Sequence, residues 1–144
     1  MERAGFGIRL GAFVLDGIIF GIVSWVVGFL LGFVIETNPI DPETGMPVWG
    51  PGTWVSLLVS LVLFFIYYVW IPFRTNGQTF GKKVTGIRIA RINGEPLTMV
   101  TLFLREFIGK TLSSMTLLIG YLVALGSQKR ALHDYIAGTV VERV

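Results

Sequence analysis

The sequence predicts an all-α integral membrane protein with about three hydrophobic helices and a short cytoplasmic β-like segment. Two observations support this fold class. Of the 144 residues, 53% are hydrophobic and only 15% are charged, whereas an average soluble domain carries about 25% charged residues. Three apolar stretches are also long enough to cross a hydrocarbon core, which takes about 20 helical residues. We expect them to form a single domain over residues 1–144.

The first predicted span covers residues 10–35 and contains one charged residue, Asp16. Arg3 and Arg9 precede the apolar run, as basic residues do in a secretory signal peptide. However, no small-residue cleavage site follows the run, and an aspartate within the apolar core is unusual in a signal peptide. We therefore expect an uncleaved transmembrane helix.

The second predicted span covers residues 53–73 and contains no charge. Trp54 and Trp70 lie near its ends, about 24 Å apart at the helical rise of about 1.5 Å per residue. This spacing suits aromatic anchors at the two membrane interfaces. The preceding loop, residues 36–52, holds four of the six prolines and three acidic residues, without Lys or Arg.

The charges of the loops predict the orientation of the chain. Residues 74–97 contain five basic residues and one acidic residue, so the positive-inside rule assigns this loop to the cytoplasm. Two crossings then put the N-terminus, with its basic residues, inside and the acidic loop 36–52 outside. We expect a multi-pass protein of the cytoplasmic membrane with a cytoplasmic N-terminus.

The basic loop has two further features. Residues 86–92 read as a short strand, and the following Asn93-Gly94 pair is a strong turn signal. The basic residues could attract nucleic acid or lipid. Beside two membrane spans, we expect them to contact the bilayer and its anionic headgroups, with no nucleic-acid partner.

The third hydrophobic segment, predicted over residues 107–128, allows two topologies. The uncharged run within it, residues 111–128, favours a third crossing. However, a single crossing would put the basic C-terminal residues outside, against the charge rule. The alternative is a re-entrant helical hairpin that includes residues 98–110 and returns the chain to the cytoplasm. In that topology the β-like tail, residues 139–144, can pair with the strand at residues 86–92.

Small residues form a stripe along the first span. The residues Gly17, Gly21, Ser24, Gly28 and Gly32 lie within about 80° of one another on a helix. Such a stripe lets another helix approach closely, although glycine is also common in membrane helices. The packing partner is either the second span or another copy of the chain, and we expect a homo-oligomer.

Asp16 carries the clearest hint of function. A carboxylate at this depth costs about 2.5–3.5 kcal/mol, so it requires a partner. Arg9 lies on the same helix face but about 10 Å away. A basic residue from another segment is therefore expected, with Arg105 and Lys110 as candidates. The site is either a proton or cation site or a buried ion pair that fixes helix register.

The sequence gives little support for metal binding or catalysis. There is one His and no Cys, which leaves no His/Cys cluster for a metal. No Ser-His-Asp or Cys-His arrangement is indicated. We therefore expect a protein that is not an enzyme, with no catalytic residues, no metal site and no cofactor.

Three motifs resemble those of the RDD family of small bacterial and archaeal membrane proteins. They are AGFGIRLGAFVLD at residues 4–16, NGQTFGKK at residues 76–83, and RALHD at residues 130–134 followed by AGTVV at residues 137–141. The motifs occur in the family's order and cover nearly the whole chain.

The resemblance assigns the arginine and the two aspartates for which the family is named to Arg9, Asp16 and Asp134, with Arg105 as a further arginine. It implies a helical membrane domain with about three spans, and transport, including sodium–proton exchange proposed for some members. Our leading hypothesis is that Asp16, with Asp134, exchanges protons or small cations, while Arg9 and Arg105 hold the carboxylates. The alternative is a non-transport assembly, scaffold or lipid-organising protein.

Overall fold

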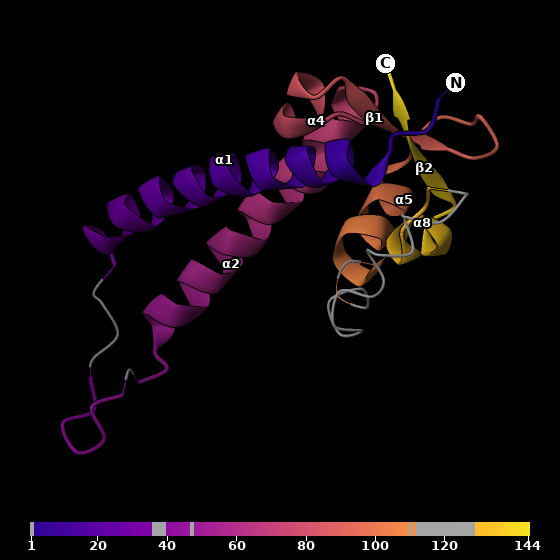
Figure 1. The fold of residues 1–144 in the computed structure, drawn as a ribbon. Coiled ribbons are helices and arrows are strands. Elements are labelled where there is room, and N and C mark those ends of the chain that lie inside the picture. Colours follow the sequence, from indigo (N-terminus) through magenta and orange to yellow (C-terminus); the bar gives the residue numbers. More distant parts are fainter. Residues whose placement is uncertain (1, 36–39, 47, 110, 112–128) are drawn as a thin grey trace.

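The computed structural model describes residues 2–35, 40–46, 48–109, 111 and 129–144. Two long helices diverge from a common end, where short helices, a small sheet and both chain termini gather (Figure 1). We call this end the cap; it comprises residues 2–5, 75–109 and 129–144. In chain order the elements are α1 (Phe6–Gly32), α2 (Pro51–Phe65), η1 (Ile66–Trp70), α3 (Ile71–Arg74), α4 (Phe80–Val84), β1 (Ile87–Arg91), α5 (Met99–Phe103), η2 (Leu104–Gly109), α8 (Leu132–Ile136) and β2 (Thr139–Arg143).

Among the described residues, two helices are long and apolar enough to cross a membrane: Phe6–Gly32 and the continuous run Pro51–Arg74. Their large apolar side chains face outward; Trp25, for example, is 69% exposed. An apolar surface of this extent is unfavourable in water and suits a lipid environment. Both clear apolar runs of the sequence analysis are thus helices of a length that can span a membrane.

The helix ends differ from the predicted span boundaries. The first helix occupies Phe6–Gly32 rather than residues 10–35, and the second run occupies Pro51–Arg74 rather than residues 53–73. The reason is that a run of apolar residues marks the membrane, whereas local backbone chemistry marks the helix. Proline at the first helical position, as at Pro51, has the backbone angle of a helix and needs no hydrogen-bonded N–H.

The second run changes its winding at η1, a π-helical segment. The N–H of Ile71 bonds to the carbonyl of Ile66, one residue further back than in an α-helix. Pro72 follows directly, and a proline removes the N–H that would bond four residues back. The widened turn leaves Tyr67, Tyr68 and Val69 all buried.

The sheet of the cap joins the middle of the chain to its end. Strand β1 pairs antiparallel with β2, from Ile87 opposite Arg143 to Arg91 opposite Thr139. Both predicted strands are therefore present, and they pair with each other. Each outer edge is covered by backbone: Ala4 N–H donates to the Val141 carbonyl at 2.8 Å, and Ile89 N–H to the Gly77 carbonyl at 2.8 Å.

One face of β1 connects the cap to both long helices. Ile87 and Ile89, two residues apart, point to the same side of the sheet and are each 1% exposed. Ile87 packs in a cluster with residues of α1, and Ile89 in a second cluster with Val69 of η1 and Leu102 of α5. The cap is thus docked on both membrane helices by its apolar interior.

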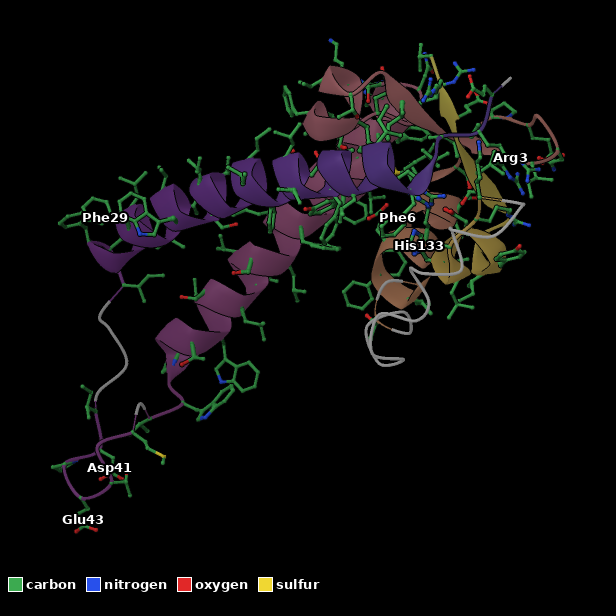
Figure 2. The ribbon with its side chains drawn as sticks, viewed as in Figure 1. Arg3, Phe6, Phe29, Asp41, Glu43 and His133 are labelled. Atoms are coloured by element: carbon green, nitrogen blue, oxygen red, sulfur yellow. The ribbon has the colours of Figure 1, made fainter. Side chains whose placement is uncertain are left out.

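The acidic and basic segments of the sequence lie at opposite ends of the molecule. Asp41 and Glu43 lie in the loop at one end of the molecule, and Arg3 and His133 lie in the cap at the other (Figure 2). The long helices separate the acidic loop from the basic cap.

Most of the third predicted span, residues 107–128, lies outside the described residues. The helix predicted over residues 98–110 is present as α5 and the π-helical η2. The Thr98 side chain caps α5 by accepting the Thr101 N–H at 3.1 Å.

Candidate functional site

Asp134 lies in the first turn of α8 and is fully buried. Its Oδ2 accepts the N–H of Ala131, the residue before the helix, at 3.0 Å. A carboxylate in this position satisfies a backbone donor that the helix leaves free. Oδ1 also accepts the Thr139 hydroxyl at 3.4 Å. The closing motif therefore builds the immediate surroundings of its own aspartate.

Two arginines from distant segments approach the Asp134 carboxylate. Arg105 of η2 donates to Oδ1 from Nε at 3.0 Å and from Nη2 at 2.8 Å. Arg9 of α1 forms an ion pair with Oδ2 through Nη2, and its Nη1 donates to the Lys129 carbonyl at 2.7 Å. The arginine pair and the second aspartate of the sequence motif thus meet in one buried network, which we call the Asp134 network.

The arginines determine the charge of Asp134. Burial by itself raises the pKa of the carboxyl, but the charges of Arg105 and Arg9 together outweigh burial and hold its pKa well below the usual range. His133 Nε2 lies 3.8 Å from Oδ1 and acts in the same direction when it is protonated. The carboxylate is therefore ionised at neutral pH.

The Asp134 network contains residues that sequence reasoning did not nominate. Glu106 is 2% exposed and accepts a hydrogen bond from Arg105 Nη1 at 2.9 Å. Arg130 donates to the carbonyl of Asp134 at 3.0 Å and to that of Thr139 at 3.2 Å. The available signal for Glu106 was its place next to Arg105 in a stretch, residues 97–109, that is otherwise uncharged. Two adjacent opposite charges in such a stretch can share one buried site.

Asp16 lies in a different network, on α1, and is 2% exposed. Its Oδ1 accepts the Tyr67 hydroxyl and the Gly81 N–H, each at 2.8 Å. Its Oδ2 accepts the Thr79 hydroxyl and lies 3.8 Å from Lys82 Nζ. We call these residues the Asp16 network.

The expected partners of Asp16 were wrong in one case and untested in the other. Arg105 pairs with Asp134 and Glu106 instead, and Lys110 lies outside the described residues. The basic partner is Lys82, which the sequence placed among the lipid-facing charges of the cytoplasmic loop. The loop folds back over α1, and no pattern in the nearby sequence predicts this contact.

The middle motif, residues 76–83, supplies most of the Asp16 network and needs its glycines for close approach. A Cβ on Gly81 would lie 2.4 Å from the Ala12 carbonyl oxygen of α1. A Cβ on Gly77, whose φ is +88°, would lie 2.1 Å from the Ile89 carbonyl oxygen. These contacts hold the motif between α1 and the sheet, where Thr79 and Gly81 reach the carboxylate.

The glycine stripe does not pack against the second span. A Cβ added at Gly17, Gly21, Gly28 or Gly32 meets no described residue within 4 Å. The two long helices instead meet through Phe20, whose ring lies 6.2 Å from that of Phe64 and 5.3 Å from that of Tyr68. Of the two partners considered, the second span is thus excluded. Ser24, the remaining member of the stripe, is half-buried.

The chemistry around both aspartates is that of anion recognition. Their neighbours are guanidinium groups, an ammonium group, hydroxyls and backbone N–H donors. Such groups suit a carboxylate, whereas a bound cation needs oxygen, nitrogen or sulfur acceptors. Within the described part of the chain, no group of three or more His, Cys, Asp or Glu side chains is placed to hold a metal ion.

Comparisons with known proteins match the part of the chain that contains these aspartates. The model of the RDD family matches residues 3–138, which include the first two motifs, the RALHD part of the third, and Arg9, Asp16, Arg105 and Asp134. Uncharacterized protein YckC of Bacillus subtilis (strain 168) is 33% identical over 145 residues, covering 97% of this chain and 84% of the relative. No solved structure matches the chain significantly.

Two further relatives come from the same organism. Uncharacterized protein YxaI is 28% identical, covering 98% of both chains. Uncharacterized membrane protein YteJ is 30% identical, covering 96% of this chain and 79% of the relative. The two long apolar helices agree with the description of YteJ as a membrane protein. With the family match over residues 3–138, these findings establish that the chain is a membrane protein and belongs to the RDD family.

Proposed function

We propose that this chain is a non-catalytic, non-transporting assembly module of the membrane. Its two spans anchor the cap, its buried ion pairs hold the cap rigidly against one membrane face, and its open glycine face joins it to another copy. The observation that carries this proposal is the state of Asp134, which two buried arginines hold as a carboxylate.

A transporting carboxylate has to release and regain a proton or a cation during each cycle. Asp134 accepts hydrogen bonds from Arg9, Arg105 and the backbone N–H of Ala131. Removing one partner from such a buried pair costs about 3–5 kcal/mol. This cost favours a permanent structural bond between α1, η2 and α8 over a cycling site.

The glycine face supports assembly. Gly17, Gly21, Gly28 and Gly32 lie on one side of α1, and nothing among the described residues covers them. Small residues let two helices approach closely in a membrane, where packing rather than water exclusion drives association. We infer that a second copy of the chain packs there.

The strand pairing supports the re-entrant topology. The antiparallel pair β1–β2 and the bridge between Arg3 and Glu142 join the N-terminus, the loop after the second span and the C-terminus. We infer that Met99 and Lys129 lie on the same side of the membrane. By the positive-inside rule this side is the cytoplasm, and the membrane is the cytoplasmic membrane.

Transport remains the second candidate because of Asp16. Its carboxylate lies inside a long apolar helix, beside two hydroxyls and 3.8 Å from Lys82 Nζ. The Thr79 hydroxyl bonds to Asp16 and accepts from Lys82 Nζ at 3.3 Å, so it can bridge a proton transfer between them. Intramembrane acids often serve proton relays. Of the two aspartates, Asp16 is the one to which this candidate applies.

A vesicle assay separates the two candidates. The full chain is reconstituted into vesicles, and internal pH is followed by a trapped dye under imposed proton, sodium and potassium gradients. We expect the same rates as in protein-free vesicles, for the wild type and for Asp16→Asn. Proton movement by the wild type that Asp16→Asn abolishes would establish the transport candidate instead.

A second measurement tests assembly directly. Gly21→Leu adds bulk to the open face and is expected to lower self-association in bilayers about ten-fold or more, measured by single-molecule photobleaching over a range of protein-to-lipid ratios. Val26→Leu is the control, since Val26 is exposed and lies about 140° from Gly21 around α1. Equal association of both variants with the wild type would contradict assembly along this face.

A further inference from the structure

The basic loop is less available to external anions than its composition indicates. Of its five basic residues, three are engaged within the chain: Lys82 lies 3.8 Å from Asp16, Arg88 lies 2.7 Å from Glu142, and Arg91 lies 2.7 Å from Glu95. The other two, Arg74 and Lys83, are exposed. They stand at the end of the second membrane run and on α4.

The position of α4 along α1 sets its depth. Gly81 of α4 packs on the backbone of α1 at Ala12 and Asp16, and α4 runs beside the capped end of α1 (Figure 1). Ala12 lies 20 residues before Gly32, the far end of α1, which corresponds to about 30 Å of helix. This length equals the thickness of the hydrocarbon core of a bilayer, about 30 Å. Helix α4 therefore lies where the hydrocarbon gives way to the headgroups.

The outer face of α4 combines apolar and basic side chains. Phe80 and Val84, four residues apart and hence on one face, are 54% and 75% exposed. Lys83 stands next to Val84 and is exposed as well. Arg74 stacks its guanidinium over the Trp70 ring at 5.8 Å, and Trp70 is itself 43% exposed. The exposed side chains of α4 and those at the end of the second run are thus both apolar and basic.

We propose that α4 and Arg74 form a binding site for an anionic phospholipid. Phe80 and Val84 enter the upper part of the acyl chains, and Lys83 and Arg74 contact the headgroup phosphates. An amphipathic surface of this kind lies in the plane of the interface, and the two basic residues complement the negative charge of the lipid. The site is independent of the assembly proposed above, because the glycine face lies on another part of α1.

The depth of α4 is tested with a fluorophore on a single cysteine, since the chain contains no native cysteine. Val84→Cys is labelled in vesicles of phosphatidylcholine and phosphatidylglycerol, and Ile92→Cys, exposed at the end of β1, is the matched control. We expect the label at position 84 to be quenched by a headgroup-proximal lipid nitroxide and protected from aqueous iodide. The label at position 92 should behave in the opposite way. Equal quenching of both labels by iodide would overturn the proposal.

The headgroup contacts are tested by lipid retention. The wild type, the double variant Arg74→Gln/Lys83→Gln, and the control Arg91→Gln are taken from mixed vesicles into detergent, and the retained phosphatidylglycerol is measured by native mass spectrometry. A basic residue at an anionic surface contributes about a five-fold gain in binding. We expect the double variant to bind phosphatidylglycerol about 25-fold more weakly and the control to match the wild type. Undiminished retention by the double variant would overturn the proposal.

Discussion

The two buried aspartates are satisfied in different ways. Asp134 is held by charge: two arginines from α1 and η2 meet one carboxylate. Asp16 is held by hydrogen bonds from two hydroxyls and a backbone N–H, and the Lys82 ammonium stands further away, at 3.8 Å. A buried carboxylate in a membrane protein therefore needs hydrogen-bond donors, but only some of these donors need be charged. It also predicts that the two sites respond differently to loss of charge.

The largest effect is expected from Asp134→Asn. The substitution keeps the shape of the side chain but leaves Arg9 and Arg105 buried together without their counter-charge. Breaking a buried ion pair in this way costs about 3–5 kcal/mol. The free energy of unfolding, measured by denaturant titration in mixed micelles, should fall by about this amount. Glu43→Gln, in the exposed loop, is the control and should leave it unchanged.

Acid should reproduce part of this loss. The pKa of Asp134 is lowered in the folded protein, so its ion pairs contribute fully above the unfolded value of about 3.9 and are lost as pH falls toward the lower folded value. The stability difference between the wild type and Asp134→Asn should be constant from pH 7 to pH 5 and shrink below about pH 4. Shrinkage already between pH 7 and pH 5 would contradict a lowered pKa.

A smaller effect is expected from Asp16→Asn. The amide keeps an oxygen for some of the donors, but its NH₂ group opposes a remaining donor, and Lys82 loses its counter-charge. Leaving one buried donor unsatisfied costs about 1–3 kcal/mol. The same denaturant titration should therefore rank Asp16→Asn between Asp134→Asn and the exposed control. A loss as large as that of Asp134→Asn would show that charge dominates both sites.

The smallest effect is expected from Arg91→Gln. Arg91 pairs with Glu95 at 2.7 Å, and the glutamate side chain is 58% exposed. Exposed ion pairs contribute about 1 kcal/mol or less, because water screens them. The melting temperature should stay within about 2 °C of the wild type, and a larger drop would mean that the pair has a structural role beyond its own contact.

The sequence predicted those features that depend on local composition. Two apolar runs were long enough to span a membrane, and both are helices. The strand before Asn93-Gly94 and the strand at the end of the chain were also predicted, and they pair. The need of Asp16 for a partner followed from the cost of a carboxylate within an apolar helix.

The features that the sequence did not predict depend on contacts between residues that are far apart in the chain. Lys82 was grouped with its basic neighbours because nothing local separates it from Lys83, yet one is buried and the other exposed. The difference arises from the close contact of Gly81 with α1, which turns only one of the two lysines toward Asp16. Likewise Arg9 and Asp134 are 125 residues apart, and only the folded cap brings them together.

The Asp134 network joins segments far apart in the chain, and this has a consequence for the order of synthesis. Arg9 enters the membrane early, but its partner Asp134 is made 125 residues later, roughly 6–25 s at ordinary rates of translation. The Asp16 network can form as soon as Lys82 has been made. A nascent chain thus completes its two membrane helices and the first network before the carboxylate that pairs with Arg9 has been made. A chain that stops before Asp134 leaves Arg9 and Arg105 without the carboxylate that they share.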